Sequence, residues 1–240
     1  MRLLFLGTPE FAVPSLRALA RTGHTLAGVV SQPDRPRGRG RQLEPTPIAA
    51  AARELGAPLL QPEKVGDEAA LAWMRAQRPD LGVVVAFGQF IPKSVRELPA
   101  RGMINAHASL LPRWRGAAPI EHAIDAGDPR TGISVMRVVK EMDAGDVCLV
   151  REIAIGADET AGELAPRLAE LAGDALVAGI DEIAAGRAEF RPQDPARVTL
   201  GVATAPAGVA EGKGAVAEPP SSVTELPAGV AIPTCIDPST

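Results

Sequence analysis

Apolar and polar positions along the chain follow two alternating patterns. Short continuous apolar runs are typical of buried strands, whereas apolar residues three or four positions apart are typical of amphipathic helices. The first pattern predicts strands at 3–6, 26–30, 58–60, 81–87, 103–107, 133–139 and 147–155. The second predicts helices at 9–20, 46–55, 67–77, 93–98, 117–126 and 160–186, the last of them interrupted near Pro166.

The order of these elements predicts the fold class. Strands and helices alternate from residue 3 to residue 107, which favours an α/β fold with a doubly wound, mostly parallel, Rossmann-like sheet. In such sheets ligands bind beyond the carboxyl ends of the strands, and residues 87–92 and 105–112 lie at two such ends. The turn Gly7-Thr8-Pro9-Glu10 lacks the glycine spacing of dinucleotide-binding folds, so we expect no nicotinamide cofactor.

Composition sets limits without changing this fold. The length of 240 residues predicts one full domain with either a small second domain or a tail. Hydrophobic residues make up 46% of the chain and charged residues 22%, which is typical of a globular protein. No apolar segment reaches the roughly 18 residues of a membrane span, and the run at 3–6 is too short for a signal peptide. We therefore expect a cytoplasmic protein with no membrane partner. Cys148 and Cys235 have no metal-binding or redox spacing.

Four arginines, Arg35, Arg37, Arg39 and Arg41, occupy alternate positions in a segment rich in proline and glycine. This segment cannot form a helix and has no apolar face to bury. One interpretation is a solvated surface loop. The other is a loop that grips phosphates, because arginines on extended backbone can follow a nucleic-acid strand. The formal net charge of −4 argues against general nucleic-acid binding but allows such a local basic element.

The segment 102–116 carries the polar residues with the clearest potential for chemistry. Asn105 and His107 lie two positions apart in a predicted strand, so both side chains project from one face. An amide donor beside a titratable imidazole at the carboxyl end of a strand could act on a carbonyl group. Taken alone, each residue also fits a structural role, as a buried histidine or as an amide in a turn.

The pattern changes near the end of the chain. From 198 to 240 there is no aromatic residue, one lysine and no arginine, and neither the helical nor the strand period is sustained. This composition is typical of weakly ordered segments. We therefore expect a domain at 1–190, followed at 191–240 by a linker and a poorly ordered C-terminal tail.

Several motifs together resemble one enzyme family. Asn105, His107 and the run Ser109-Leu110-Leu111-Pro112, followed by Asp143-Ala144-Gly145-Asp146, are similar to the formyltransferases that use 10-formyltetrahydrofolate. More narrowly, the segments GTPEF at 7–11, QPDRPRGRG at 32–40 and SLLPRWRGAAPI at 109–120 resemble the methionyl-tRNA formyltransferases. The resemblance covers about residues 1–197 and keeps the motifs in order.

The resemblance implies a Rossmann-like formyltransferase fold and transfer of a formyl group from 10-formyltetrahydrofolate to the α-amine of methionyl initiator tRNA, for translation initiation. It implies that Asn105 and His107 stabilise the oxyanion, while Asp143 orients the imidazole and aids proton transfer. No metal is required, and a monomer is expected. The implied folate-binding residues are Phe87, Gly88, Phe90, Ile91, Ser109, Leu110, Leu111 and Pro112. The implied tRNA-binding residues are Arg35, Arg37, Arg39 and Arg41.

That family continues into a C-terminal β-barrel of the OB type, and nothing after about residue 197 resembles it. We expect a reading frame truncated or shifted near residue 198, with tRNA affinity below that of longer relatives. A second hypothesis is a related formyltransferase acting on a small amine, such as an amino-sugar nucleotide or glycinamide ribonucleotide. A third is a non-catalytic folate-binding module. The arginine segment and the run 114–119 favour tRNA over a small amine.

Overall fold

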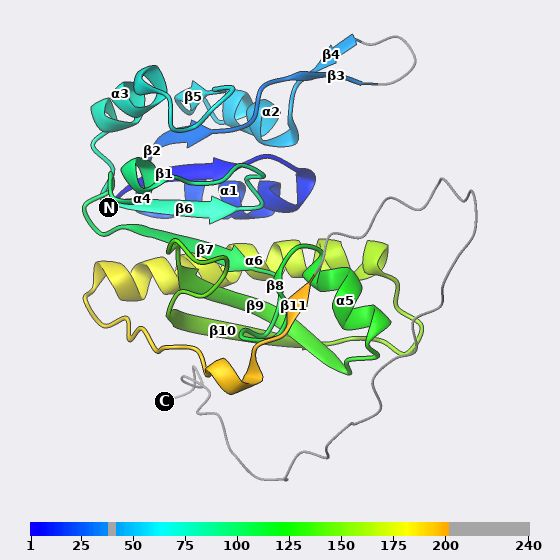
Figure 1. Ribbon diagram of the computed structural model, residues 1–240. Helices are drawn as coiled ribbons and strands as arrows, with labels where there is room; N and C mark the ends of the chain where they lie inside the picture. The colour runs from blue at the N-terminus through cyan, green and yellow to red at the C-terminus, as the bar shows by residue number, and fades with distance from the viewer. Residues whose placement is uncertain (38–41, 202–240) are drawn as a thin grey trace, which may run out of the picture. The chain divides into compact units, whose positions relative to one another are not determined.

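The computed structural model describes residues 1–37 and 42–201. Its centre is a seven-stranded sheet with the order β10-β9-β7-β6-β1-β2-β5 (Figure 1). Strands β5, β2, β1, β6 and β7 are parallel to one another, whereas β9 pairs antiparallel with both β7 and β10. The strands are β1 (Arg2–Gly7), β2 (Thr25–Val30), β5 (Leu59–Leu60), β6 (Leu81–Val85), β7 (Met103–His107), β9 (Arg130–Arg137) and β10 (Val147–Ala154). The predicted doubly wound, mostly parallel α/β sheet is confirmed.

Helices cover both faces of this sheet. The helices are α1 (Val13–Ala20), α2 (Pro47–Glu54), α3 (Glu68–Ala76), α4 (Lys93–Arg96), α5 (Pro119–Asp125) and α6 (Ala161–Ala184), with 3-10 turns η1 (Glu10–Ala12) and η2 (Pro195–Arg197). Side chains of α1, α2 and α6 pack in one apolar core, and those of α3 and α4 in another. The central strand β1 contributes to both, because alternate side chains point to opposite faces. Phe5 lies in the first core, and Leu4 and Leu6 lie in the second.

Helix α6 is continuous, so the predicted interruption near Pro166 is wrong. A proline removes one backbone donor and is normally unfavourable inside a helix. Here Pro166 lies near the amino end, where Thr160 and Glu163 form a capping box that satisfies other donors. Beyond it, Leu168 and Leu176 are fully buried in the core. We infer that this burial outweighs the cost of the proline.

The arginine segment forms a two-stranded ribbon where the sequence predicted a loop. β3 (Arg35–Arg37) pairs antiparallel with β4 (Gln42–Glu44), with Arg35 opposite Glu44. Alternating residues on extended backbone can pair in this way without an apolar face, because the ladder needs only backbone groups. Arg39 and Arg41 lie outside the described residues.

The segment after α6 returns to the sheet. Arg191 and Val147 exchange backbone hydrogen bonds of 2.9 Å, and β11 (Leu200–Gly201) pairs in parallel with β8 (Arg115–Gly116) (Figure 1). We call residues 191–201 the strap. The linker and poorly ordered tail were expected at 191–240; residues 191–201 form the strap, and residues 202–240 lie outside the described residues.

A search of the described residues finds no helix that is both long and apolar enough to cross a membrane. Cys148 is a free thiol in β10, and Cys235 lies outside the described residues.

Candidate active site

The predicted amide–imidazole pair lies at the carboxyl end of β7. Asn105 and His107 project from one face of the strand, because the intervening Ala106 points into the first apolar core. His107 is only 6% exposed, whereas Asn105 is half-buried. Strand β9 lies alongside, with Met136 opposite Asn105 and Ser134 opposite His107.

Both ring nitrogens of His107 have polar neighbours. Nε2 lies 2.7 Å from the carbonyl oxygen of Trp114, and a carbonyl can only accept, so Nε2 carries the hydrogen in this contact. Nδ1 lies 3.5 Å from Oδ2 of Asp143. That second contact is attractive when the ring is protonated, because the carboxylate is an acceptor.

Asp143 reaches the imidazole from the loop between β9 and β10. Its backbone has φ of 49°, in the left-handed region that is unfavourable for residues other than glycine. Its Oδ2 also accepts a hydrogen bond of 2.9 Å from the backbone N–H of Gly116. The carboxylate therefore connects His107 to the loop that carries the Trp114 carbonyl.

Asn105 differs from His107 in its lack of protein partners. Within residues 1–37 and 42–201, the Asn105 side chain makes no hydrogen bond to another residue. Because the side chain is only half-buried, its amide is accessible to a bound molecule. An amide donor of this kind suits an oxygen that gains negative charge.

The turn at 109–112 is held by two serines. Ser109 is fully buried and its hydroxyl donates to the carbonyl of Arg113 at 2.6 Å. Ser134 donates to the carbonyl of Ser109 at 2.7 Å and accepts from the N–H of Leu111 at 3.0 Å. The Ser109 side chain thus shapes the turn, and Leu110, Leu111 and Pro112 are half-buried around it.

The loop after β6 holds the other residues expected to bind folate. Phe87 and Ile91 are buried in the second apolar core, whereas Phe90 is 73% exposed. The carbonyl of Phe87 accepts from the Thr8 hydroxyl at 2.8 Å and from the Gln32 amide at 3.0 Å. Gly88 has φ of 79°. The buried side chains of Phe87 and Ile91 anchor this loop and leave the backbone of Gly88 exposed.

The arginine ribbon is exposed in its described part. Arg35 forms an ion pair of 2.6 Å with Glu63, and their side chains are 62% and 66% exposed. An ion pair this exposed contributes little to stability. If a phosphate replaced the Glu63 carboxylate as the partner of Arg35, little folding free energy would therefore be lost.

Sequence reasoning missed a cluster that supports the Trp114 loop. Arg113 donates two hydrogen bonds to Asp128, of 2.8 and 2.6 Å, and the Trp114 indole donates a third of 2.8 Å. Partial burial acts to raise the pKa of Asp128, but hydrogen bonds from Arg113 and Trp114 outweigh it and hold the pKa below its ordinary value. The Trp114 ring stacks on His122 with centroids 5.3 Å apart. No sequence periodicity signals these contacts.

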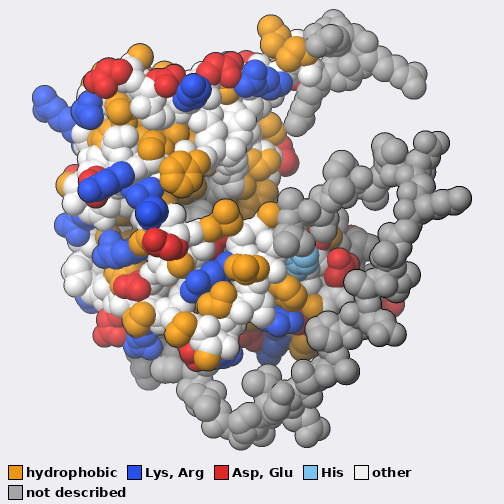
Figure 2. All heavy atoms as spheres, in the orientation of Figure 1, with side chains coloured by type: hydrophobic (Ala, Val, Ile, Leu, Met, Phe, Trp, Pro, Cys, Tyr) orange, Lys and Arg blue, Asp and Glu red, His pale blue; other side chains and the backbone are white. Residues whose placement is uncertain are grey.

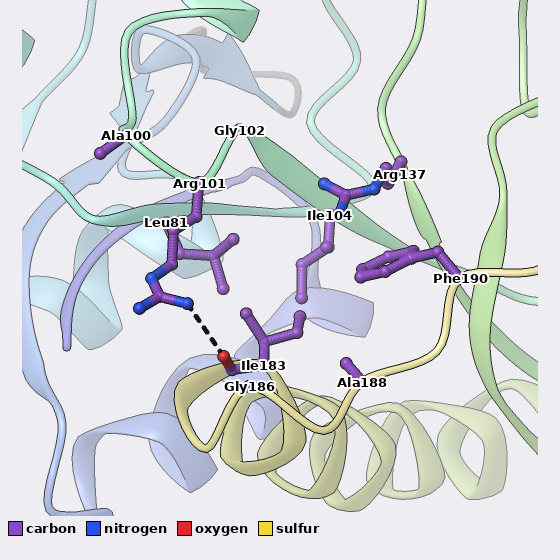
Figure 3. A pocket seen from close by; sticks show the side chains of 10 residues that line it. All are labelled: Leu81, Ala100, Arg101, Gly102, Ile104, Arg137, Ile183, Gly186, Ala188 and Phe190. Atoms are coloured by element: carbon purple, nitrogen blue, oxygen red, sulfur yellow. Dashed lines mark hydrogen bonds between the residues drawn. The ribbon is translucent and has the colours of Figure 1, made fainter.

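One cavity lies away from this site. It measures about 550 Å³ and its wall includes Leu81, Arg101, Ile104, Arg137, Ile183 and Phe190 (Figure 3). Arg137 lies over the Phe190 ring at 3.7 Å, and Arg101 donates to the carbonyl of Ile183 at 3.1 Å. None of the predicted site residues lines it.

Comparison with known proteins identifies the family. The sequence model of the family described as "Formyl transferase" matches residues 1–180. The chain belongs to the formyl transferase family. Its Asn105, His107 and Asp143 all lie within the matched residues.

Two curated relatives show how much of a formyl transferase this chain spans. It is 48% identical over 199 residues to the methionyl-tRNA formyltransferase of Moorella thermoacetica and 50% identical over 200 residues to that of Anaeromyxobacter dehalogenans. Each match covers 83% of this chain and 64% of the relative. The matched region therefore spans slightly less than two thirds of each relative's length.

Solved structures share the fold at low sequence identity. Glycinamide ribonucleotide transformylase 1 from Symbiobacterium toebii matches with a TM-score of 0.67 and 19% identity, over 81% of this chain and 94% of that one. The sugar 3N-formyl transferase WlaRD matches with a TM-score of 0.63 and 16% identity, over 83% of this chain and 69% of that one. These similarities support the formyl transferase fold.

Within residues 1–37 and 42–201, no group of three or more His, Cys, Asp or Glu side chains could hold a metal ion.

Proposed function

We propose that the protein transfers a formyl group from 10-formyltetrahydrofolate to the α-amine of methionyl initiator tRNA. The observation that carries this proposal is the contact between His107 and Asp143 beside Asn105. It occurs in a chain that is 48–50% identical to relatives named methionyl-tRNA formyltransferase. The proposal includes a role in translation initiation, a cytoplasmic location and a monomeric state.

The site suits attack of a neutral amine on a formyl carbon. As the nitrogen bonds to the carbon, the formyl oxygen gains negative charge, and the Asn105 amide can donate to it. The amine loses one proton and N10 of the leaving folate gains one, so the reaction needs proton transfer and no oxidant. No protein nucleophile is required, because the donor already carries an activated formyl group.

His107 and Asp143 act together in this proposal. The Asp143 carboxylate faces Nδ1 and holds the ring in the orientation in which its Nε2–H is the donor. In the structure that N–H is bonded to the Trp114 carbonyl. Donation to the formyl oxygen therefore replaces or shares this bond as the substrates bind.

We assign the folate to the loops after β6 and β7. Residues 87–91 and 109–112 lie at the carboxyl ends of neighbouring parallel strands, where α/β sheets bind ligands. The free amide of Asn105 lies at the same edge. The structure of WlaRD, which shares the fold, was determined in the presence of 5-N-formyl-THF. Phe87, Gly88, Phe90 and Ile91 would contact the pterin chiefly through their backbone.

We assign the tRNA to the arginine ribbon. Arg35, Arg37, Arg39 and Arg41 would contact phosphates of the acceptor end. On the face shown in Figure 2, basic and acidic side chains are interspersed. A local element that carries several arginines is therefore a better candidate for phosphate binding than this mixed surface.

Transfer of labelled formyl from 10-formyltetrahydrofolate to methionyl-tRNA tests the proposal. We expect turnover by the full chain and a fall to background in His107→Ala. Parallel reactions should contain glycinamide ribonucleotide or an amino-sugar nucleotide as acceptor. Transfer to one of these and none to tRNA would favour the small-amine hypothesis. Folate binding without transfer to any acceptor would favour the binding module.

A further inference from the structure

The strap, residues 191–201, crosses the two loops that flank His107. One side chain in it, Gln193, makes three hydrogen bonds to those loops. Its Nε2 donates to the carbonyl of Asp143 at 2.8 Å and to the carbonyl of Gly145 at 2.7 Å. Its Oε1 accepts from Nε of Arg115 at 2.9 Å. Both N–H groups and the oxygen of this amide are therefore engaged.

These bonds act on the backbone that aims the Asp143 carboxylate. Asp143 has a left-handed backbone, which a non-glycine residue adopts only when its surroundings hold it there. Gly145, two residues on, packs directly against the carbonyl of Arg137, where a Cβ would not fit. The turn is thus held between β9 on one side and the Gln193 amide on the other.

A second strap residue, Thr199, holds the opposite side of the imidazole. Its hydroxyl accepts from the N–H of Trp114 at 2.8 Å, and its carbonyl accepts from the N–H of Arg115 at 2.9 Å. Trp114 also has a left-handed backbone, with φ of 58°, and its carbonyl bonds Nε2 of His107. The strap therefore supports both neighbours of the ring, the Asp143 carboxylate and the Trp114 carbonyl.

We propose that Gln193 is a positioning residue for formyl transfer, which acts by holding the Asp143 turn against the Arg115 loop so that the carboxylate faces Nδ1 of His107. This inference rests on the proposed function for its kinetic consequences. Its structural content, the coupling of Gln193 to His107 through Asp143, does not depend on which acceptor is used. A displacement of about 1 Å at such a group can cost roughly 10²-fold in rate.

The test replaces Gln193 in two ways. Gln193→Met keeps the length of the side chain and removes its donors. Gln193→Glu keeps the shape and places an acidic oxygen against two carbonyls, which repel it. The matched control is Gln77→Met at the end of α3, because the Gln77 amide also donates to a carbonyl, that of Trp73 at 3.2 Å.

We expect both Gln193 variants to lower kcat by about 10–100-fold, with KM for the formyl donor changed less than about threefold. Gln77→Met should leave both constants near those of the wild type. In Asp143→Asn the further change Gln193→Met should cost less than about threefold, because its effect is transmitted by the Asp143 carboxylate. An equal cost in both backgrounds would overturn the proposal, since it would show that Gln193 acts independently of Asp143.

Imidazole NMR supplies a readout that does not require activity. The chain has three histidines, and we expect Gln193→Met to move the ring signals of His107 in the same direction as Asp143→Asn. Unchanged His107 signals in a folded Gln193→Met protein would overturn the proposal. If the wild-type protein shows no formyl transfer, the proposed function is wrong, but the His107 signals still show whether Gln193 is coupled to His107 through Asp143. If the methionine variant does not fold, Gln193→Glu is measured in its place.

Discussion

Nδ1 of His107 lies 3.5 Å from Oδ2 of Asp143, and the same oxygen accepts a hydrogen bond from the backbone N–H of Gly116. The carboxylate therefore joins the imidazole to the loop whose Trp114 carbonyl bonds the other ring nitrogen. The His107 ring therefore lies between two hydrogen-bond acceptors, the Asp143 carboxylate and the Trp114 carbonyl, and both belong to loops outside β7.

Loss of the Asp143 charge should slow formyl transfer without unfolding the chain. Asp143→Asn keeps the size of the side chain and an oxygen that can accept from Gly116. We expect kcat to fall about 10²-fold, because the imidazole loses the charged partner that orients its ring. Steady-state kinetics check this, with Asp146→Asn in the same turn as the control. Equal kcat in the two variants would contradict the assigned role.

The Asn105 side chain should contribute strongly to kcat and little to the free energy of unfolding. Removal of one oxyanion donor typically costs about 10²–10³ in kcat, so we expect this loss in Asn105→Ala. The side chain has no hydrogen-bond partner among the described residues, so the free energy of unfolding should change by less than about 1 kcal/mol. Urea denaturation beside the kinetic assay separates the two effects. A destabilised variant with wild-type kcat would assign Asn105 a structural role.

Asp128 should stabilise the fold in a pH-dependent way. Its pKa is held below the ordinary value of 3.8, so the stabilisation is complete above about pH 5 and is lost as pH falls through the lower folded value. At neutral pH we expect Asp128→Asn to be less stable by about 2 kcal/mol, because it loses charged hydrogen bonds to Arg113 and Trp114.

Urea unfolding of wild type and Asp128→Asn from pH 7 to pH 3 checks this dependence. The difference in unfolding free energy should shrink below about pH 4, as the carboxylate is protonated. Asp125→Asn, an exposed change on α5, is the control. A difference that is constant over the whole range would show that the charge of Asp128 does not stabilise the loop.

Cys148 should react slowly with alkylating reagents. Burial raises the pKa of its thiol to about 11, so at pH 8 the reactive thiolate is about 10²-fold scarcer than for a free cysteine. Iodoacetamide labelling of Cys235→Ser, in which Cys148 is the remaining thiol, measures this rate. We expect the free-cysteine rate after denaturation in urea. The same rate in the native protein would contradict the burial of the thiol.

Gly88 should be needed for formyl-donor binding. Its φ of 79° is unfavourable for a residue with a Cβ, and a Cβ there would displace the Gln32 amide, which bonds the Phe87 carbonyl. Gly88→Ala should shift the loop after β6 and raise KM for the formyl donor about tenfold. Because alanine at this left-handed φ would be strained, we also expect a loss of about 1–2 kcal/mol in stability. Gly56→Ala is the control for left-handed strain, since that residue has φ of 64° and no neighbour within 4 Å of the added carbon. A similar KM for the formyl donor in both variants would contradict the proposal that this loop binds the folate.

Local pattern in the sequence determined the classes of element and much of strand β7, which carries Asn105 and His107. Of the strand predicted at 81–87, residues 81–85 form β6 and are buried throughout, as expected for a strand covered on both faces, whereas Ala86 is exposed in a left-handed turn. The common face of Asn105 and His107 followed from the period of two in a strand. These features depend on neighbours in the chain, so the sequence alone suffices for them.

Contacts between distant residues were decided only by the tertiary structure. Pro166 stays inside a continuous helix because the core buries the residues that follow it. The arginine segment pairs with itself, and Gln193 reaches the Asp143 turn from the strap. The neighbours of His107 were only partly foreseeable, since family resemblance suggested Asp143 and nothing suggested the Trp114 carbonyl. Such contacts depend on the packing of separate segments and on left-handed turns such as those at Trp114 and Asp143, which no period in the sequence encodes.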